Sequence, residues 1–131
     1  MKLKRAIVVM FLFILIVAAC DNTTENKEDF LGEVVEVEIE LEPETPRVNT
    51  DTTIKAIVTQ GKDKVNDANE VIFEVWKEGQ EDHEMIEASN QGDGIYSITK
   101  QFKTEGNYFV VSHVTARDMH VMPRKAYTVA K

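Results

Sequence analysis

Cysteine and positive charge are both scarce in this chain of 131 residues. The only cysteine is Cys20, so an intrachain disulfide is excluded. Lys and Arg number 15 against 23 Asp and Glu, which gives a net charge of −8. Nucleic-acid binding needs clustered positive charge, so the acidic balance argues against a nucleic-acid partner. The length leaves room for one domain and excludes most multi-domain enzymes.

Sequence motifs of common enzyme classes are also missing. The chain has no Gly-x-Ser-x-Gly nucleophile elbow, no phosphate-binding glycine loop and no His-Glu-x-x-His zinc motif. Ser112 lies beside His113, but neighbours in a strand point to opposite faces and cannot act as a nucleophile and its base. We therefore expect a protein that is not an enzyme and has no small-molecule substrate.

Hydrophobic runs long enough to cross a bilayer are absent too. The longest apolar run covers residues 6–19, which is fourteen residues, whereas a spanning helix needs roughly 20. Three of the first five residues are Lys or Arg. Positive charge followed by a short apolar run predicts a signal peptide over residues 1–19.

Cys20 stands at the end of this apolar run, directly after two alanines. Small residues before a cysteine resemble the lipobox of bacterial lipoproteins, whose cysteine receives a diacylglyceryl group and becomes the N-terminus. We expect lipidation at Cys20, a flexible tether over residues 20–32, and the rest of the chain on the outer face of the cell membrane. An uncleaved anchor with an incidental cysteine is the alternative, and it also places the chain outside the cytoplasm.

The remaining residues, 33–131, show the period of β-strands and no sustained helical period. In Glu33–Leu41, apolar residues alternate with glutamates, which is typical of a half-buried strand. Seven short strands separated by turns predict an all-β fold, an immunoglobulin-like antiparallel β-sandwich. The predicted strands are Glu33–Leu41, Thr52–Gln60, Val71–Lys77, a short one around His83–Ala88, Ile95–Phe102, Asn107–Ala116 and Met119–Val129.

Three residues add detail to this fold prediction. Tyr108 at the start of the sixth strand suits a tyrosine corner, and Trp76 lies on the third, where such sandwiches bury a tryptophan. Pro123 interrupts the last strand and cannot donate to a ladder, so we expect an edge strand or a bulge there.

Histidine and methionine lie close together in the predicted domain. The pattern His-x-Met occurs twice, and residues i and i+2 of a strand point to the same face about 7 Å apart. Imidazole with thioether is a ligand set for copper, as Cu(I), Cu(II) or both. The alternative is that the methionines fill the core and the histidines are ordinary exposed residues. The candidate copper ligands are His83, Met85, His113, Met119, His120 and Met122.

Some of these ligands should be neighbours. A hairpin between the last two strands would bring His113 and His120 together. Simple alternation places His120 and Met122 on the outward face, opposite to Met119, unless a bulge at Pro123 changes the parity. Whether His83 and Met85 reach the same site is left open by the sequence.

The segments EVWKEGQEDHEMIEA, GDGIYSI and HVTARDMHVMP resemble the YtkA-like family of Bacillus-type bacterial lipoproteins. The resemblance implies an immunoglobulin-like sandwich and a role in copper supply to the dinuclear copper centre of cytochrome c oxidase. Its implied partners are subunit II of the oxidase or another copper assembly factor, and the implied ligands are the six residues named above. Two alternatives are a copper sequestration or resistance lipoprotein and a metal-free immunoglobulin-like adhesion or assembly module.

Overall fold

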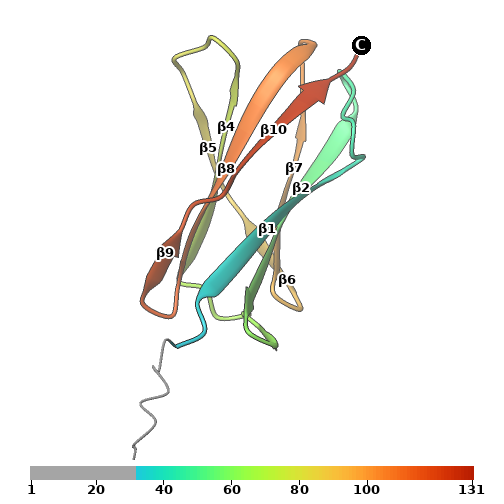
Figure 1. Cartoon of the computed structure of the whole chain (residues 1–131). Coiled ribbons are helices and arrows are strands. Elements are labelled where there is room, and N and C mark those ends of the chain that lie inside the picture. Colours follow the sequence, from blue (N-terminus) through green and yellow to red (C-terminus); the bar gives the residue numbers. More distant parts are fainter. Residues whose placement is uncertain (1–31) are drawn as a thin grey trace, which may run out of the picture. The chain divides into compact units, whose positions relative to one another are not determined.

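Ten β-strands and no helix make up residues 32–131, the part of the chain that the computed structural model describes (Figure 1). The predicted signal peptide, Cys20 and the tether up to residue 31 lie outside the described residues. All seven predicted strands are present, Pro123 divides the last into two, and β3 and β6 are additional. The strands are β1 Val35–Glu42, β2 Asp51–Gln60, β3 Asp63–Lys64, β4 Glu70–Lys77, β5 Glu84–Glu87, β6 Ser89–Gly92, β7 Ile95–Gln101, β8 Gly106–Ala116, β9 Met119–Val121 and β10 Arg124–Val129.

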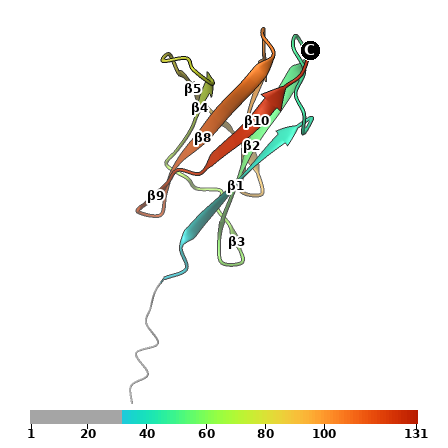
Figure 2. The same cartoon turned by 45° about the horizontal axis from the view of Figure 1, so that its top comes forward.

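The strands form two antiparallel sheets that pack face to face. One sheet, which we call the β2 sheet, has the order β1-β2-β7-β6 (Figure 1). The short strand β3 pairs with β2 (Figure 2). The other, the β8 sheet, has the order β10-β8-β4-β5, with β9 paired to β8. The predicted all-β sandwich is therefore confirmed. No helix in residues 32–131 has the length and apolar character needed to cross a membrane.

Alternation along the strands builds the core between the sheets. In β1 the apolar side chains point inward and the glutamates outward, as their period of two predicts. In β4, Phe73 is fully buried between Val71 and Val75, and Ile54 of β2 is fully buried on the other side of the core. Full burial of such a side chain contributes roughly 1.5–3 kcal/mol to the free energy of folding. Residues 32–131 form one compact unit with their own core.

Two of the three details predicted for the strands agree with the structure, and one does not. The Tyr108 hydroxyl donates to the carbonyl oxygen of Thr104 (2.8 Å), which confirms the tyrosine corner. The prediction that Trp76 is the buried tryptophan of the sandwich is wrong. Trp76 is only partly buried and lies on the outer face of β4, because its parity is opposite to that of Phe73, the residue that takes the core position.

Pro123 lies between β9 and β10 at the edge of the β8 sheet, so the predicted edge position is confirmed. Val121 of β9 pairs with Val114, and Arg124 of β10 pairs with Val111, so the register is the same on both sides of the proline. The Pro123 carbonyl still accepts a hydrogen bond from the N–H of Ser112 (3.1 Å). The proline removes one donor from the ladder without changing which side chains face outward.

Tyr127 of β10 lies on the inward face of the strand, where it packs against the core. Its ring lies against Phe102 and Tyr108, and its hydroxyl is buried without a hydrogen-bond partner among the described residues. Burial raises the pKa of Tyr127 above its usual value. In the unfolded chain Tyr127 ionises near pH 10, the usual tyrosine pKa, whereas the folded chain resists ionisation. The tyrosine therefore contributes to the free energy of unfolding below about pH 10, and this contribution is lost as the pH rises further.

We expect Tyr127→Phe to leave the free energy of unfolding unchanged or about 1 kcal/mol higher at pH 7, because an unpaired buried hydroxyl is removed. Above pH 10 the variant should lose stability less steeply than the wild type. Urea unfolding at pH 7 and pH 10.5 measures both effects. Tyr108→Phe is the matched control, and it should be destabilised by about 1 kcal/mol because its hydroxyl is paired. Equal destabilisation of the two variants would contradict this account.

Candidate metal site

The outer face of the β8 sheet gathers most of the predicted ligands. In β4, Phe73 and Val75 enter the core, so Ile72, Glu74 and Trp76 point outward. In β8, His113 pairs with Ile72 and shares its outward face. Apart from Ser112, the inward residues of both strands are hydrophobic, and their burial determines which side chains remain on the outside.

Glu74 lies at the centre of this face and contacts two of the predicted ligands. Its Oε1 accepts a hydrogen bond from Nδ1 of His83 (2.6 Å), and its Oε2 accepts one from Nε2 of His113 (2.7 Å). These hydrogen bonds, the one from His83 first, hold the pKa of the Glu74 carboxyl below its ordinary value, against a smaller opposing effect of burial. The carboxylate therefore joins the segment before β5 to the middle of β8.

His113 and His120 are brought together by the β8–β9 hairpin, which confirms the expected proximity. Their ring centroids are 6.1 Å apart. His120 pairs with Thr115 across the hairpin, and Nδ1 of His120 is hydrogen-bonded to the Thr115 hydroxyl (2.8 Å). Nε2 of His120 is thus the ring nitrogen that this hydrogen bond leaves open.

The methionines divide between the two faces of the sheet. Met85 and Met122 are 57% and 56% exposed and are among the three exposed large hydrophobic residues of the described chain. Met85 pairs with Glu74, and the constant register around Pro123 places Met122 opposite His113. Met119 instead packs against the hydrophobic core. Core filling therefore describes Met119 but not Met85 or Met122.

An aromatic and cationic group adjoins the cluster. The indole of Trp76 stacks on the His83 ring, with centroids 4.2 Å apart and an interplanar angle of 9°. The guanidinium of Arg124 lies 4.0 Å from the Phe109 ring centroid and 5.3 Å from that of Trp76. His83 and Arg124 therefore cover part of the Trp76 ring on the outer face of β4, which explains why this tryptophan is partly buried although it lies outside the core.

The geometry limits which atoms can share an ion. In residues 32–131 no group of three His, Cys, Asp or Glu side chains is placed to hold a metal ion. Two imidazoles on one ion, each with a metal–nitrogen distance of about 2 Å, have centroids at most about 6.4 Å apart. His113 and His120 fall within that limit, and Met122 can supply a thioether beside them. Two nitrogens and one sulfur suit copper better than harder cations.

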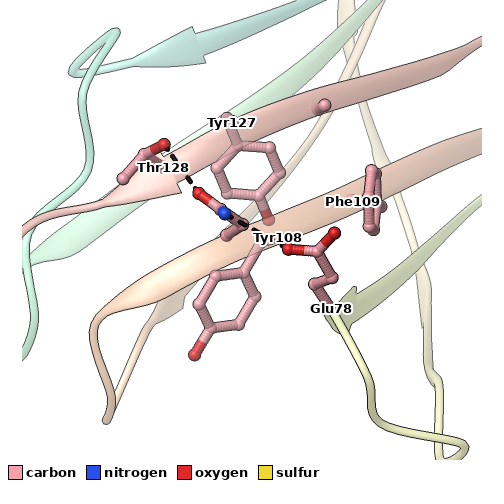
Figure 3. A pocket seen from close by; sticks show the side chains of 7 residues that line it. Glu78, Tyr108, Phe109, Tyr127 and Thr128 are labelled. Atoms are coloured by element: carbon pink, nitrogen blue, oxygen red, sulfur yellow. Dashed lines mark hydrogen bonds between the residues drawn. The ribbon is translucent and has the colours of Figure 1, made fainter.

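A shallow hollow of about 300 Å³ lies farther along β8 and β10 (Figure 3). Glu78, Phe109 and Thr128 are among its lining residues, and Asn107 joins the Glu78 carboxylate to the Thr128 hydroxyl by hydrogen bonds. No predicted ligand lines this hollow. The candidate site is an exposed sheet face and not a cleft.

Sequence reasoning named His83, Met85, His113, His120 and Met122, which share the outer face of the β8 sheet, and Met119, which does not. It missed Glu74 and Thr115. The one available signal for Glu74 was its position as the only acidic residue inside the dense apolar run VIFEVWK. Nothing in the sequence singled out Thr115.

Comparison with known proteins gives one family and two structures. The model of a family described as YtkA-like matches residues 32–113. This range covers β1 to β7 and most of β8, and it includes Glu74, His83, Met85 and His113. His120 in β9 and Met122 directly after β9 follow the matched range. No curated protein matches the chain.

Two solved structures of superoxide reductase (neelaredoxin) from Ignicoccus hospitalis, the second a variant, are each 13% identical to this chain. The first has a TM-score of 0.46 and covers 73% of this chain and 80% of the reductase. The second has a TM-score of 0.47 and covers 80% and 86%. Similarity at this level carries no functional argument.

Proposed function

The chain belongs to the YtkA-like family, and from this membership and its exposed His and Met cluster we propose that it is an extracytoplasmic copper-binding protein. It is anchored to the outer face of the cell membrane through Cys20. It delivers copper for assembly of the dinuclear centre of cytochrome c oxidase, either to subunit II or to another copper assembly factor. Copper is its cargo, bound as Cu(I), Cu(II) or both.

The observation that carries this proposal is the exposure of Met85 and Met122 beside histidines on one sheet face. Exposing a large apolar side chain gives up the free energy that its burial would contribute. Met119, only three residues from Met122, is packed against the core as an ordinary methionine would be. A role for the thioether sulfur atoms explains why two methionines remain outside.

An open ligand set suits transfer to another protein. A carrier must bind copper firmly and still release it by ligand exchange, so the incoming ligands of the recipient need direct access to the ion. Imidazole and thioether ligands on an exposed face allow that access. A thioether also cannot be lost to disulfide formation in an oxidising compartment.

A deletion strain grown under copper limitation tests delivery. We expect its cytochrome c oxidase to contain less copper, because the recipient site receives too little, and added copper to restore it. Complementation with Met119→Leu should restore the copper content, whereas a variant with His113, His120 and Met122 replaced should not. Oxidase copper is measured by metal analysis and absorption spectroscopy of membranes.

Three other outcomes separate the alternatives. Normal oxidase copper in the deletion strain would contradict delivery. Copper sensitivity with an intact oxidase would instead support sequestration or resistance. Full complementation by a variant that lacks all six His and Met candidates would support a metal-free adhesion or assembly module.

A further inference from the structure

We propose that Glu74 is a positioning residue that presets which ring nitrogens His83 and His113 offer to copper. This inference rests on the proposed copper-binding function and names a role for a residue that does not itself bind the ion. His83 then offers Nε2, and His113 offers Nδ1. The two histidines would thus bind through opposite ring nitrogens.

The argument begins with the two hydrogen bonds of one carboxylate. An ionised carboxylate can only accept, so each ring must carry its proton on the nitrogen that faces Glu74. That nitrogen is Nδ1 in His83 (2.6 Å) and Nε2 in His113 (2.7 Å). In a neutral imidazole the other nitrogen has the free lone pair, and a metal needs that lone pair.

The same contacts hold the rings in place. His83 comes before β5 on an exposed segment, yet its ring is held at one edge by Glu74 and on one face by Trp76. His113 is held at its edge by the second oxygen of the same carboxylate. Restricting ring rotation before binding reduces the entropy that the site loses when copper arrives.

Direct ligation by Glu74 is disfavoured by the same geometry. Both carboxylate oxygens are occupied by ring nitrogens, and the side chain is only 22% exposed. Binding an ion through either oxygen would break at least one of the bonds that orient the histidines. Carboxylates that hold metal-binding histidines in other proteins change metal affinity by about 10–100-fold when they are replaced.

Glu74→Gln is the decisive variant. Glutamine has nearly the same shape but only one acceptor oxygen, and its NH₂ group cannot accept a ring N–H. At least one of the two histidines therefore loses its preset tautomer. Glu87→Gln is the matched control, because Glu87 lies on the same sheet at the edge strand β5, opposite Ile72, and is exposed.

The experiment uses residues 21–131, which contain the whole sandwich core, uniformly labelled with ¹⁵N. Two-bond ¹⁵N–¹H correlation spectra of the copper-free protein at pH 8 report the tautomer of each ring, and competition with calibrated chelators reports Cu(I) and Cu(II) affinity. We expect Nδ1–H in His83 and Nε2–H in His113 of the wild type. In Glu74→Gln at least one ring should switch, with copper affinity about 10–100-fold lower, and Glu87→Gln should change neither.

The possible failures are distinguishable. If the wild type binds copper and Glu74→Gln leaves either both tautomers or the affinity unchanged, the positioning role is wrong and the proposed function stands. If the wild type binds no copper, the proposed function fails, and the positioning role fails with it. Unchanged amide shifts of the core strands verify that Glu74→Gln remains folded.

Discussion

Replacing His113 with alanine is expected to weaken copper binding by more than the roughly 100-fold that loss of an outer-shell partner can cost. His113 is next to His120 and opposite Met122, and Glu74 holds its ring in place. Its removal takes away one ligand and leaves His120 and Met122 without the imidazole that would share the ion with them. Chelator competition measures the affinity. Trp76 provides a second readout, because it is the only tryptophan and stacks on His83, so copper bound nearby should quench its fluorescence.

A pair of methionine variants controls this prediction. Met122→Leu should lower Cu(I) affinity by at least about tenfold with no loss of stability, since Met122 is exposed and leucine lacks the sulfur. Met119→Leu should leave the affinity unchanged, because Met119 packs against the core. Equal effects of the two substitutions on copper affinity would contradict the assignment of Met122 to the site.

Replacing Phe73 with alanine is expected to lower the free energy of unfolding by about 3–5 kcal/mol. Phe73 is fully buried in the middle of β4, which pairs on both sides, so the surrounding strands cannot easily close over the cavity. A domain of this size is stabilised by only about 5–15 kcal/mol, so the loss is a large fraction of the total. Urea unfolding followed by circular dichroism measures it.

Trp76→Ala on the same strand is the comparison for this prediction. Trp76 is partly buried on the outer face, and its removal should cost about 1–2 kcal/mol. If Trp76 were the core tryptophan of the sandwich, the order of the two variants would be reversed. A larger loss for Trp76→Ala than for Phe73→Ala would therefore contradict the observed parity of β4.

Strand positions were predictable because the evidence for them is local. Alternating apolar residues and glutamates identified β1, and glycine-rich turns delimited β7 and β8. The tyrosine corner was also predictable, because Tyr108 bonds to Thr104 only four residues away. Short elements such as β6 were missed, since four exposed polar residues carry no hydrophobic period.

The face assignment of β4 was only weakly indicated by its sequence. VIFEVWK has apolar residues at both parities, and the single indication that Phe73 and not Trp76 enters the core is Glu74, which shares the parity of Trp76. The choice depends on the central position of β4, whose outer face is covered by His83 and whose inner face meets the β2 sheet.

The candidate site was likewise predictable only in part. The proximity of His113 and His120 follows from one hairpin and was predicted from it. The connection from His83 to His113 runs through Glu74, which is 39 residues away from His113 in the chain, and depends on the pairing of β4 with β8. No local pattern contains that pairing.

By itself, the sequence determined the class of fold, the position of most strands, and the six His and Met candidates. Each of these depends on side-chain type and on spacing over a few residues. The tertiary structure decided which candidates share a face: Met119 turns into the core, and Glu74 joins His83 to His113. The physical reason is that sheet pairing and core packing are set by contacts between distant segments, and these contacts decide which side of each strand is buried.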